Sequence, residues 1–310
     1  MKDTKVIVIL GPTASGKTGL GIKLAKELDG EIISGDSMQV YREMDIGTAK
    51  PDMAEREGIP HHLIDILDIS EKFTVAEFCN LACKAVEEIA SRGKTPIIVG
   101  GTGMYIETLV NGRLYETASA DMEMRRKYTE YAERNGALAL HALLAEVDPE
   151  SAEKIHPNNI KRVVRALEIA SSGENTKSCL EQTQQDNKPF ESLLLYLTPP
   201  TREVMYDRIN KRVDIMMEMG LLEEVKLLDS KGLRTTPTAA QAIGYKEFFP
   251  YFDGDCTLEQ SVEKLKQYTR NYAKRQTTYF SHMKDLVPVS ADTQGFEAAK
   301  RICKQWLKTH

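Results

Sequence analysis

Short, unbroken apolar runs occur at four places along the chain. The first is residues 6–10 in "KVIVIL", and another is residues 95–103, "TPIIVGGTG". A third lies in "GEIISGDSMQV" and ends near Asp36, and a fourth lies in "SLLLYLTPP". Strands that are buried on both faces have this continuous apolar character. The four runs therefore predict buried strands of a parallel sheet.

Helical periodicity alternates with these strands. A helix is predicted at about residues 17–28, directly after the first strand, and another at roughly residues 75–91, before "TPIIVGGTG". A proline-started helix is predicted in "TREVMYDRINKRV", behind the last strand. Strands that alternate with helices indicate an α/β fold with a parallel sheet flanked by helices on both faces.

The pattern changes between Leu114 and about Asn187. Charged, helix-prone stretches such as "DMEMRRKYTEYAERNG" and "NNIKRVVRALEIASSG" replace the apolar runs. We therefore predict a helical insertion domain at 114–187, and an α/β core formed by 1–113 and 188–310. After Arg234, "TAAQAIGYKEFF" and "LEQSVEKLKQYTRNYAKRQTTYF" also look helical, and they are expected to wall the cleft of the core.

The turn after the first strand carries a full Walker A pattern, Gly-x-x-x-x-Gly-Lys-Thr. It predicts a P-loop NTPase-like core in which backbone N–H groups and a helix N-terminus hold phosphate oxygens. Lys17 would neutralise their charge, and Thr18 can bind Mg²⁺. The phosphates can belong to a nucleoside triphosphate, to a nucleotide that is phosphorylated, or to a diphosphate that leaves. The loop residues are Gly11, Pro12, Thr13, Ala14, Ser15, Gly16, Lys17 and Thr18.

Two polar residues follow strands beside this loop. No acidic residue ends "IIVGGTG", where a Walker B acid would stand, and no N-K-x-D motif is present. Asp36 is the carboxylate at a strand end, and the carboxyl ends of parallel strands meet at the ligand crevice. It can hold Mg²⁺ through water, take a proton from a nucleophile, or cap the following turn. Thr102 can face the same crevice or bond to its own backbone.

Composition limits the partners. The 310 residues carry a formal net charge of −5, so local patches must provide any nucleic-acid binding. Such a patch is predicted at residues 263–280, which hold five basic residues and one acidic residue, with interleaved tyrosines that we interpret as core. Five cysteines without a C-x-x-C pair indicate reduced thiols, a cytoplasmic protein and no zinc site. No segment is long and apolar enough for a membrane span, so we expect no membrane partner.

Seven ordered blocks resemble bacterial tRNA dimethylallyltransferases over about residues 5–282. This family prenylates the exocyclic N6 amine of the adenosine next to the anticodon of tRNA. The resemblance implies that the loop holds dimethylallyl diphosphate, with Mg²⁺, and that no phosphoryl group is transferred. It also implies that the partner is the anticodon loop of tRNA, and we expect the protein to be a monomer. The blocks are "GPTASGKT", "GDSMQVYR", "HHLID", "GGTGMY", "IHPNNIKRVVRALE", "QAIGYKE" and "YAKRQTTYF".

The resemblance also implies roles for single residues. Asp36 would be the base that takes the proton of the amine, and Thr102 would orient that amine. Lys17 and Arg212 would stabilise the departing diphosphate, with Arg208 as the alternative arginine. The expected tRNA contacts are Asp36, Ser37, Met38, Gln39 and Thr102 in the core, and Arg125, Lys161, Arg162 and Arg165 in the insertion.

Three other functions fit parts of the sequence. A small-molecule or nucleoside kinase shares the phosphate loop, the carboxylate on the second strand and the arginines on a late helix. A transferase that prenylates free adenine nucleotides needs no basic surface beyond its pocket. An RNA-binding module without chemistry would bind tRNA and ignore dimethylallyl diphosphate.

Overall fold

The computed structural model describes residues 2–112, 122–171, 188–198 and 201–309. The chain divides into two compact units. The first unit is formed by 1–107 and 190–310, and the second by 108–189. The predicted insertion, 114–187, lies within the second unit.

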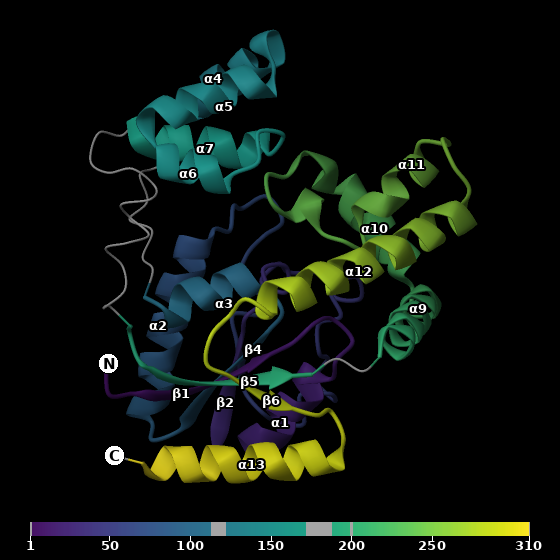
Figure 1. Cartoon of the computed structure of the whole chain (residues 1–310). Helices are drawn as coiled ribbons and strands as arrows, with labels where there is room; N and C mark the ends of the chain where they lie inside the picture. The colour runs from purple at the N-terminus through teal and green to yellow at the C-terminus, as the bar shows by residue number, and fades with distance from the viewer. Residues whose placement is uncertain (1, 113–121, 172–187, 199–200, 310) are drawn as a thin grey trace. The chain divides into compact units, whose positions relative to one another are not determined.

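A six-stranded sheet forms the centre of the first unit, and every neighbouring pair of strands is parallel (Figure 1). The spatial order is β3-β2-β4-β1-β5-β6, so the strand that leads into the phosphate loop lies inside the sheet. The predicted α/β fold with a parallel sheet is confirmed. The strands are β1 (Lys5–Leu10), β2 (Gly30–Ser34), β3 (His61–His62), β4 (Thr95–Gly100), β5 (Glu191–Leu197) and β6 (Leu286–Val289).

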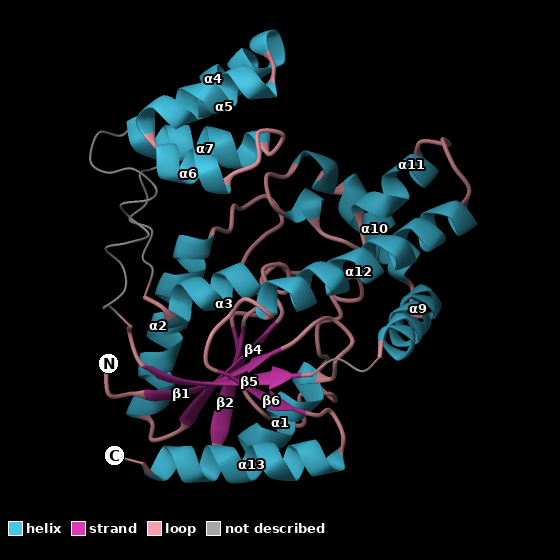
Figure 2. Cartoon of the chain, in the orientation of Figure 1, coloured by secondary structure: helices cyan, strands magenta, loops and turns pink. Residues whose placement is uncertain are grey.

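Helices cover both faces of this sheet (Figure 2). One face packs on α1 (Lys17–Glu27) and α13 (Thr293–Lys308), where Ile9, Ile97 and Leu195 join the apolar side chains of these helices in one buried cluster. On the other side, α2 (Val75–Ser91) begins with a capping box between Thr74 and Glu77 and packs on β2 and β4. Burial of whole strands on both faces explains their unbroken apolar sequence.

Helices α9 (Arg202–Glu218), α10 (Leu221–Ser230) and α12 (Leu258–Phe280) follow β5. The prolines before α9 lie outside the described residues. The predicted helix in "TAAQAIGYKEFF" is wrong. The structure has short 3-10 turns there, at Ala239–Gln241 and Lys246–Phe248, followed by α11 (Phe249–Phe252). The physical reason is Gly244, whose φ of +108° breaks the helix and whose missing side chain admits the backbone of Gly47.

The second unit is helical in its described part, as its sequence predicts. It contains α4 (Met122–Asn135), α5 (Ala137–Val147), α6 (Pro149–Lys154) and α7 (Ile160–Ser171). Leu140, Leu144, Val163 and Leu167 are almost fully buried and form its own apolar core. Asp148 caps α6 by accepting a hydrogen bond from the Ser151 N–H.

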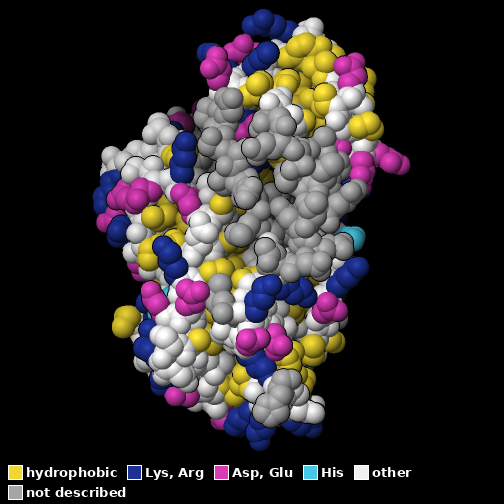
Figure 3. All heavy atoms as spheres, turned by 90° about the vertical axis from the view of Figure 1, so that its left-hand side faces the viewer, with side chains coloured by type: hydrophobic (Ala, Val, Ile, Leu, Met, Phe, Trp, Pro, Cys, Tyr) yellow, Lys and Arg dark blue, Asp and Glu magenta, His cyan; other side chains and the backbone are white. Residues whose placement is uncertain are grey.

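The described surface mixes charges of both signs. On the face in Figure 3, Lys and Arg side chains alternate with Asp and Glu side chains over the described area. Among residues 2–112, 122–171, 188–198 and 201–309, no helix has the length and apolar content that a bilayer span requires.

Candidate active site

The phosphate loop links the end of β1 to the start of α1. Gly16 has a φ of +91°, in the left-handed region that favours glycine, and it stands directly before the first helical residue, Lys17. The Lys17 Nζ donates to the Pro12 carbonyl over 2.6 Å, so the side chain folds back across the loop. The Ser15 hydroxyl is buried without a hydrogen-bond partner in the described part of the chain. The turn thus presents an ammonium, an unused hydroxyl and a helix N-terminus, which together suit an anion.

Burial changes the charge of Lys17. Desolvation and, to a lesser extent, the charge of Arg212 lower the pKa of its ammonium, the charge of Asp36 acts in the opposite direction, and the resulting pKa is about 7. Near neutral pH the ammonium is therefore poised to gain or lose its proton. An anion in the loop would raise this pKa and hold the positive charge.

Asp36 follows β2, two residues after the last strand residue. The backbones of Gly35 and Gly100 are in close contact and bring this strand end against β4. A side chain would prevent the contact, since a Cβ on Gly100 would lie 2.3 Å from the Gly35 carbonyl oxygen. The Asp36 Oδ1 accepts from the Met38 N–H at 2.8 Å and from the Gln39 N–H at 3.4 Å. No group in the described residues donates to Oδ2, so one carboxylate oxygen fixes the turn and the other remains for a ligand.

The surroundings of Asp36 have opposing effects on the pKa of its carboxyl group. Desolvation raises the pKa of the carboxyl, while its two backbone hydrogen bonds and the charges of Lys17 and Arg212 lower it. The net shift is upward, which makes the carboxylate a better proton acceptor. Since Arg212 also has a lowered pKa from desolvation, the three groups share one poorly hydrated region.

Arg212 and Arg208 differ in their surroundings although they lie one turn apart on α9. Arg212 is half-buried and lines the same cavities as Lys17 and Asp36. Arg208 is exposed and lines none of these cavities. Of the two arginines, only Arg212 lies where a diphosphate on the loop can reach it.

Three connected hollows surround this group. A small one of about 90 Å³ lies between Lys17, Asp36 and Gln39. One of about 300 Å³ continues past Asp36, Ser37 and Met38, and one of about 420 Å³ opens beside Lys17 and Thr18. Arg212 lines all three. The site therefore has a phosphate side and an opposite side that meet at this arginine.

Thr102 does not line these cavities but lies behind one wall. Its Oγ1 accepts from the Ser37 N–H at 3.2 Å, and its side chain is hydrogen-bonded to Tyr272. Tyr272 itself lines the two cavities next to Asp36, and desolvation raises the pKa of its phenol to about 12. The hydroxyl of Thr102 thus holds the Asp36 turn and Tyr272 together.

Gln39 connects loop backbone to strand β2. Its Nε2 donates to the Thr48 and Ala49 carbonyls, each at 3.3 Å, and its Oε1 accepts from the Ser34 hydroxyl at 3.0 Å. Both ends of the amide already have partners within the protein. In this arrangement Gln39 fixes the loop at 48–49, whereas Ser37 and Met38 line the hollow of about 300 Å³.

The four basic residues that are predicted tRNA contacts in the second unit fall into two pairs. Arg125 and Arg165 both form ion pairs at 2.8 Å with Glu168, whose side chain is 1% exposed. Lys161 and Arg162 are exposed and form no ion pair within the described residues. The first pair stabilises the unit, and the second pair is available to an external anion.

Several residues at the site escaped the sequence analysis. Gln276 on α12 accepts from the Thr13 N–H at 2.8 Å and donates to the Gly101 carbonyl at 2.9 Å, so it joins the phosphate loop to the turn after β4. The prediction that Tyr268 and Tyr272 belong to the core is not borne out, because both are only partly buried and line cavities. The sequence signal for them was the basic, tyrosine-rich run itself. Glu224 on α10 accepts hydrogen bonds from the Ile46 and Gly47 N–H groups of a loop that lines the site, and no local sequence signal indicated it.

His61 and His62, which form strand β3, make hydrogen bonds within the protein. His62 Nε2 lies 2.7 Å from Glu31, and His61 Nδ1 lies 2.8 Å from the Ile59 carbonyl oxygen. No cluster of three or more His, Cys, Asp or Glu side chains suited to a metal ion occurs in the described residues. A metal ion at this site would therefore depend on hydroxyl, water and ligand oxygens.

Comparison with known proteins gives a consistent result. Residues 39–283 match the family described as IPP transferase. A tRNA dimethylallyltransferase of Bacillus subtilis is 51% identical over 282 residues, which cover 90% of this chain and 89% of the relative. The tRNA dimethylallyltransferase of Bacillus anthracis is 50% identical over 287 residues, which cover 92% and 90%.

Solved structures agree with these sequences. The tRNA delta(2)-isopentenylpyrophosphate transferase of Staphylococcus epidermidis superposes with a TM-score of 0.72 at 43% identity, covering 98% of this chain and 99% of that chain. A eukaryotic dimethylallyltransferase acting on tRNA superposes with a TM-score of 0.86 at 36% identity, covering 98% and 80%. The similarity extends over almost the whole chain in each case.

Proposed function

Because this chain belongs to the IPP transferase family, we propose that it transfers a dimethylallyl group from dimethylallyl diphosphate to the N6 amine of the adenosine 3′ of the anticodon in tRNA. The observation that carries the proposal is the meeting of Lys17, Arg212 and Asp36 at one small cavity. Cations lie on the phosphate side of it and a carboxylate lies on the other. A leaving diphosphate and an amine that loses a proton need this pairing.

Lys17, Arg212 and Asp36 can account for each bond that forms or breaks in this transfer. The N6 lone pair forms a bond to the allylic carbon while the bond from that carbon to the diphosphate oxygen breaks, and the oxygen keeps the electron pair. Lys17 and Arg212 stabilise the charge that grows on this oxygen. The amine proton passes to Asp36 Oδ2, since Oδ1 already accepts two backbone hydrogen bonds.

Mg²⁺ is the cofactor we propose for the phosphate side. Thr18 lines the hollow of about 420 Å³ together with the carboxylates of Asp45, Asp52 and Glu55. The Thr18 hydroxyl is a hard oxygen donor of the kind that Mg²⁺ prefers, and it fits an ion whose other ligands are water and the diphosphate. The carboxylates of the described residues do not gather into a metal site of their own. When bound, the ion would supply positive charge to the leaving group.

The RNA surface is also part of the proposal. Target adenosines inside an anticodon loop must be unstacked to reach a pocket. Ser37, Met38 and Tyr272 line the hollow of about 300 Å³ beside Asp36, which offers an apolar and aromatic wall for a base. Lys161 and Arg162 of the second unit provide exposed cations for the backbone.

The decisive experiment incubates the protein with labelled dimethylallyl diphosphate, Mg²⁺ and tRNA that lacks the modification. Label recovered on an adenosine of the tRNA supports the proposal. Parallel reactions with γ-labelled ATP and with free adenosine monophosphate test the kinase and the free-nucleotide alternatives. Transfer of phosphate, or prenylation of the free nucleotide in preference to tRNA, would contradict the proposal. The relatives named above are dimethylallyltransferases and give no support to a kinase.

A further inference from the structure

A further cavity lies between residues 243–250 and helix α12. It has a volume of about 490 Å³ and is lined by residues of the first unit alone. The site proposed for the target adenosine does not use it. Hollows of a few hundred Å³ are the usual size of ligand pockets. Its lining residues are Ile243, Lys246, Glu247, Pro250, Lys264, Tyr268 and Arg275.

One wall of this cavity contains a buried carboxyl group with an unused oxygen. Glu247 is 3% exposed, and its Oε2 accepts from the Gly244 N–H at 2.9 Å. Its Oε1 is buried and has no hydrogen-bond partner in the described residues. Buried polar atoms are nearly always paired, so an unpaired one beside a cavity indicates a partner that is supplied from outside.

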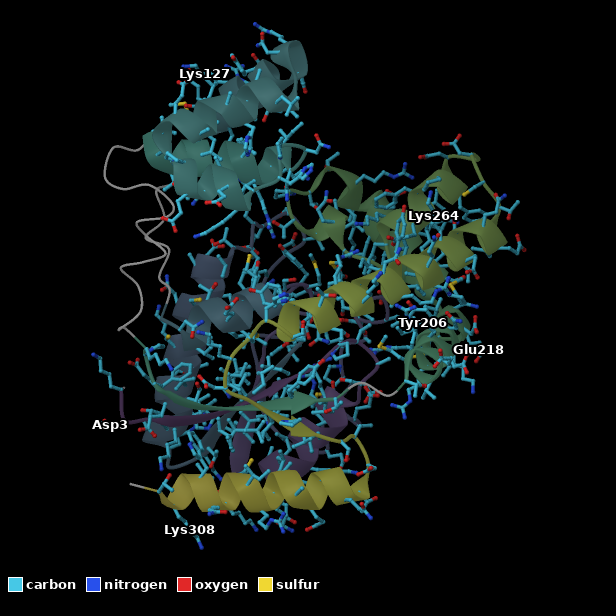
Figure 4. All side chains as sticks on the ribbon, in the orientation of Figure 1. Asp3, Lys127, Tyr206, Glu218, Lys264 and Lys308 are labelled. Atoms are coloured by element: carbon cyan, nitrogen blue, oxygen red, sulfur yellow. The ribbon has the colours of Figure 1, made fainter. Side chains whose placement is uncertain are left out.

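Cations and an aromatic ring line the same cavity as Glu247. Lys264, Tyr268 and Arg275 lie on one face of α12, and Lys264 is marked on that helix in Figure 4. Lys264 and Arg275 are exposed and form no ion pair with any described residue. The Tyr268 ring is half-buried, which leaves part of it open to a ligand. A carboxyl oxygen, an aromatic face and free cations correspond to the three parts of a nucleotide: base N–H, base face and phosphate.

The cavity continues into the proposed reaction site. Ile243, Lys246 and Arg275 line both this cavity and the hollow of about 300 Å³ that Asp36 also lines. Arg275 also lies 5.6 Å from the ring centre of Tyr272, which lines that hollow. A ligand in the second cavity is therefore a direct neighbour of a base at Asp36.

We propose that this cavity is a second nucleotide pocket, which holds the base of an RNA nucleotide adjacent to the target adenosine. The inference rests on the proposed function for the identity of the RNA. Tyr268 stacks on the base, Glu247 Oε1 faces an N–H on its edge, and Lys264 and Arg275 contact its phosphate. The pocket would give the enzyme a means to select the sequence around its target.

The test uses the full-length protein and an anticodon stem-loop RNA, and measures RNA binding in the absence of the prenyl donor. Tyr268→Leu removes the stacking surface, while Tyr268→Phe keeps it. Loss of one base stack predicts about 5- to 100-fold weaker binding for the leucine variant and binding within about threefold of wild type for the phenylalanine variant. Lys264→Ala is compared with Lys274→Ala, since Lys274 is an exposed lysine of the same helix that does not line the cavity.

Stem-loops with one abasic nucleotide identify the position that is bound. If the pocket holds a base, one flanking abasic substitution weakens wild-type binding as much as Tyr268→Leu does, and the two changes together cost no more than either alone. Glu247→Gln is then expected to change the preference for the base at that position. Melting temperature and donor affinity of each variant show that the fold and the phosphate site are intact.

Three results would overturn the inference. One is unchanged RNA affinity of Tyr268→Leu, and another is an equal loss from Lys264→Ala and Lys274→Ala, which indicates general attraction to phosphate. The third is full additivity of Tyr268→Leu with every abasic substitution. Binding is measured without the donor, so a protein that binds RNA in this way but transfers no prenyl group would contradict the proposed function and leave the pocket standing.

Discussion

The hydroxyl group of Tyr245 donates a hydrogen bond to the Glu224 carboxylate over 2.7 Å. The same carboxylate accepts from the backbone N–H groups of Asp45, Ile46 and Gly47 at 3.2, 2.8 and 3.1 Å. Tyr245 is fully buried, and a Cβ on Gly47 would lie 2.5 Å from its ring. One carboxylate on α10 thus fixes a loop that lines both the phosphate side of the site and the side of Asp36.

Replacement of Glu224 by Gln is expected to destabilise the protein. The amide keeps one acceptor oxygen and turns an NH₂ group toward donors, so about half of the four hydrogen bonds are lost. Hydrogen bonds to a charged group contribute about 1.5–3 kcal/mol each, so the loss of two should lower the free energy of unfolding by about 3 kcal/mol or more. Urea unfolding measures this loss, and the exposed neighbour Glu223→Gln serves as the control. Equal unfolding midpoints for the two variants would contradict the role of Glu224.

The base role of Asp36 predicts a defect in turnover. Asp36→Asn keeps an oxygen for the Met38 and Gln39 N–H groups but cannot accept the amine proton. We expect turnover to fall by about a hundredfold or more while donor affinity changes little. Single-turnover rates and donor binding are measured on the same preparation. An active Asp36→Asn variant would remove this residue from the chemistry.

The pH dependence follows from the direction of the shift. Desolvation raises the pKa of Asp36, and only the ionised form is a base. Turnover is therefore expected to decrease as the pH falls through this raised pKa, at a higher pH than an ordinary aspartate would give. The acidic limb of the wild-type profile should be absent from the residual activity of Asp36→Asn. A limb that persists in the variant would assign the titration to another group.

The sequence predicts those parts of the site that depend on local order. The phosphate loop, Lys17 and Asp36 each stand next to a strand whose apolar run identifies it, so topology alone places them at one sheet edge. Glu224 and Gln276 could not be predicted, because their partners, Gly47 and Thr13, are remote in sequence. The strand β6 was also missed, since its four residues include Pro288 and only Val289 is buried.

The same distinction explains the errors in the C-terminal region. Helix propensity is high in "TAAQAIGYKEFF", yet the approach of the Gly47 backbone to Gly244 requires a turn there. Periodic tyrosines on α12 resemble a core face, but this face borders two cavities. Contacts between segments that are remote in the sequence determine both the turn and the position of the tyrosines, and a local stretch of sequence does not reveal such contacts.

Donor binding is expected to take up a proton through Lys17. The pKa of this ammonium is about 7 in the free protein, so at about pH 8.5 most molecules hold a neutral amine. A bound diphosphate raises the pKa, and close to one proton should be taken up. Calorimetry in buffers of different ionisation enthalpy measures the uptake. Lys17→Arg is the matched control, because its guanidinium stays charged and should bind the donor without uptake. Absence of uptake by the wild type would contradict the lowered pKa.

Replacements in the second unit should separate structural cations from those available to RNA. Arg125→Ala leaves the buried Glu168 carboxylate with one arginine fewer, and we expect a loss of about 1–2 kcal/mol in stability, less than for a fully buried pair because Arg125 is 39% exposed on its side chain.

Lys161→Ala removes an exposed charge without an ion pair among the described residues, so stability should stay within about 0.5 kcal/mol of wild type. It should instead weaken tRNA binding and reduce the slope of log affinity against log salt by about one, because one phosphate contact is lost. Thermal unfolding and salt-dependent binding of both variants provide the comparison. An unchanged salt slope for Lys161→Ala would exclude this lysine from the RNA surface. An unchanged melting temperature for Arg125→Ala would show that Glu168 does not need Arg125 for its stabilisation.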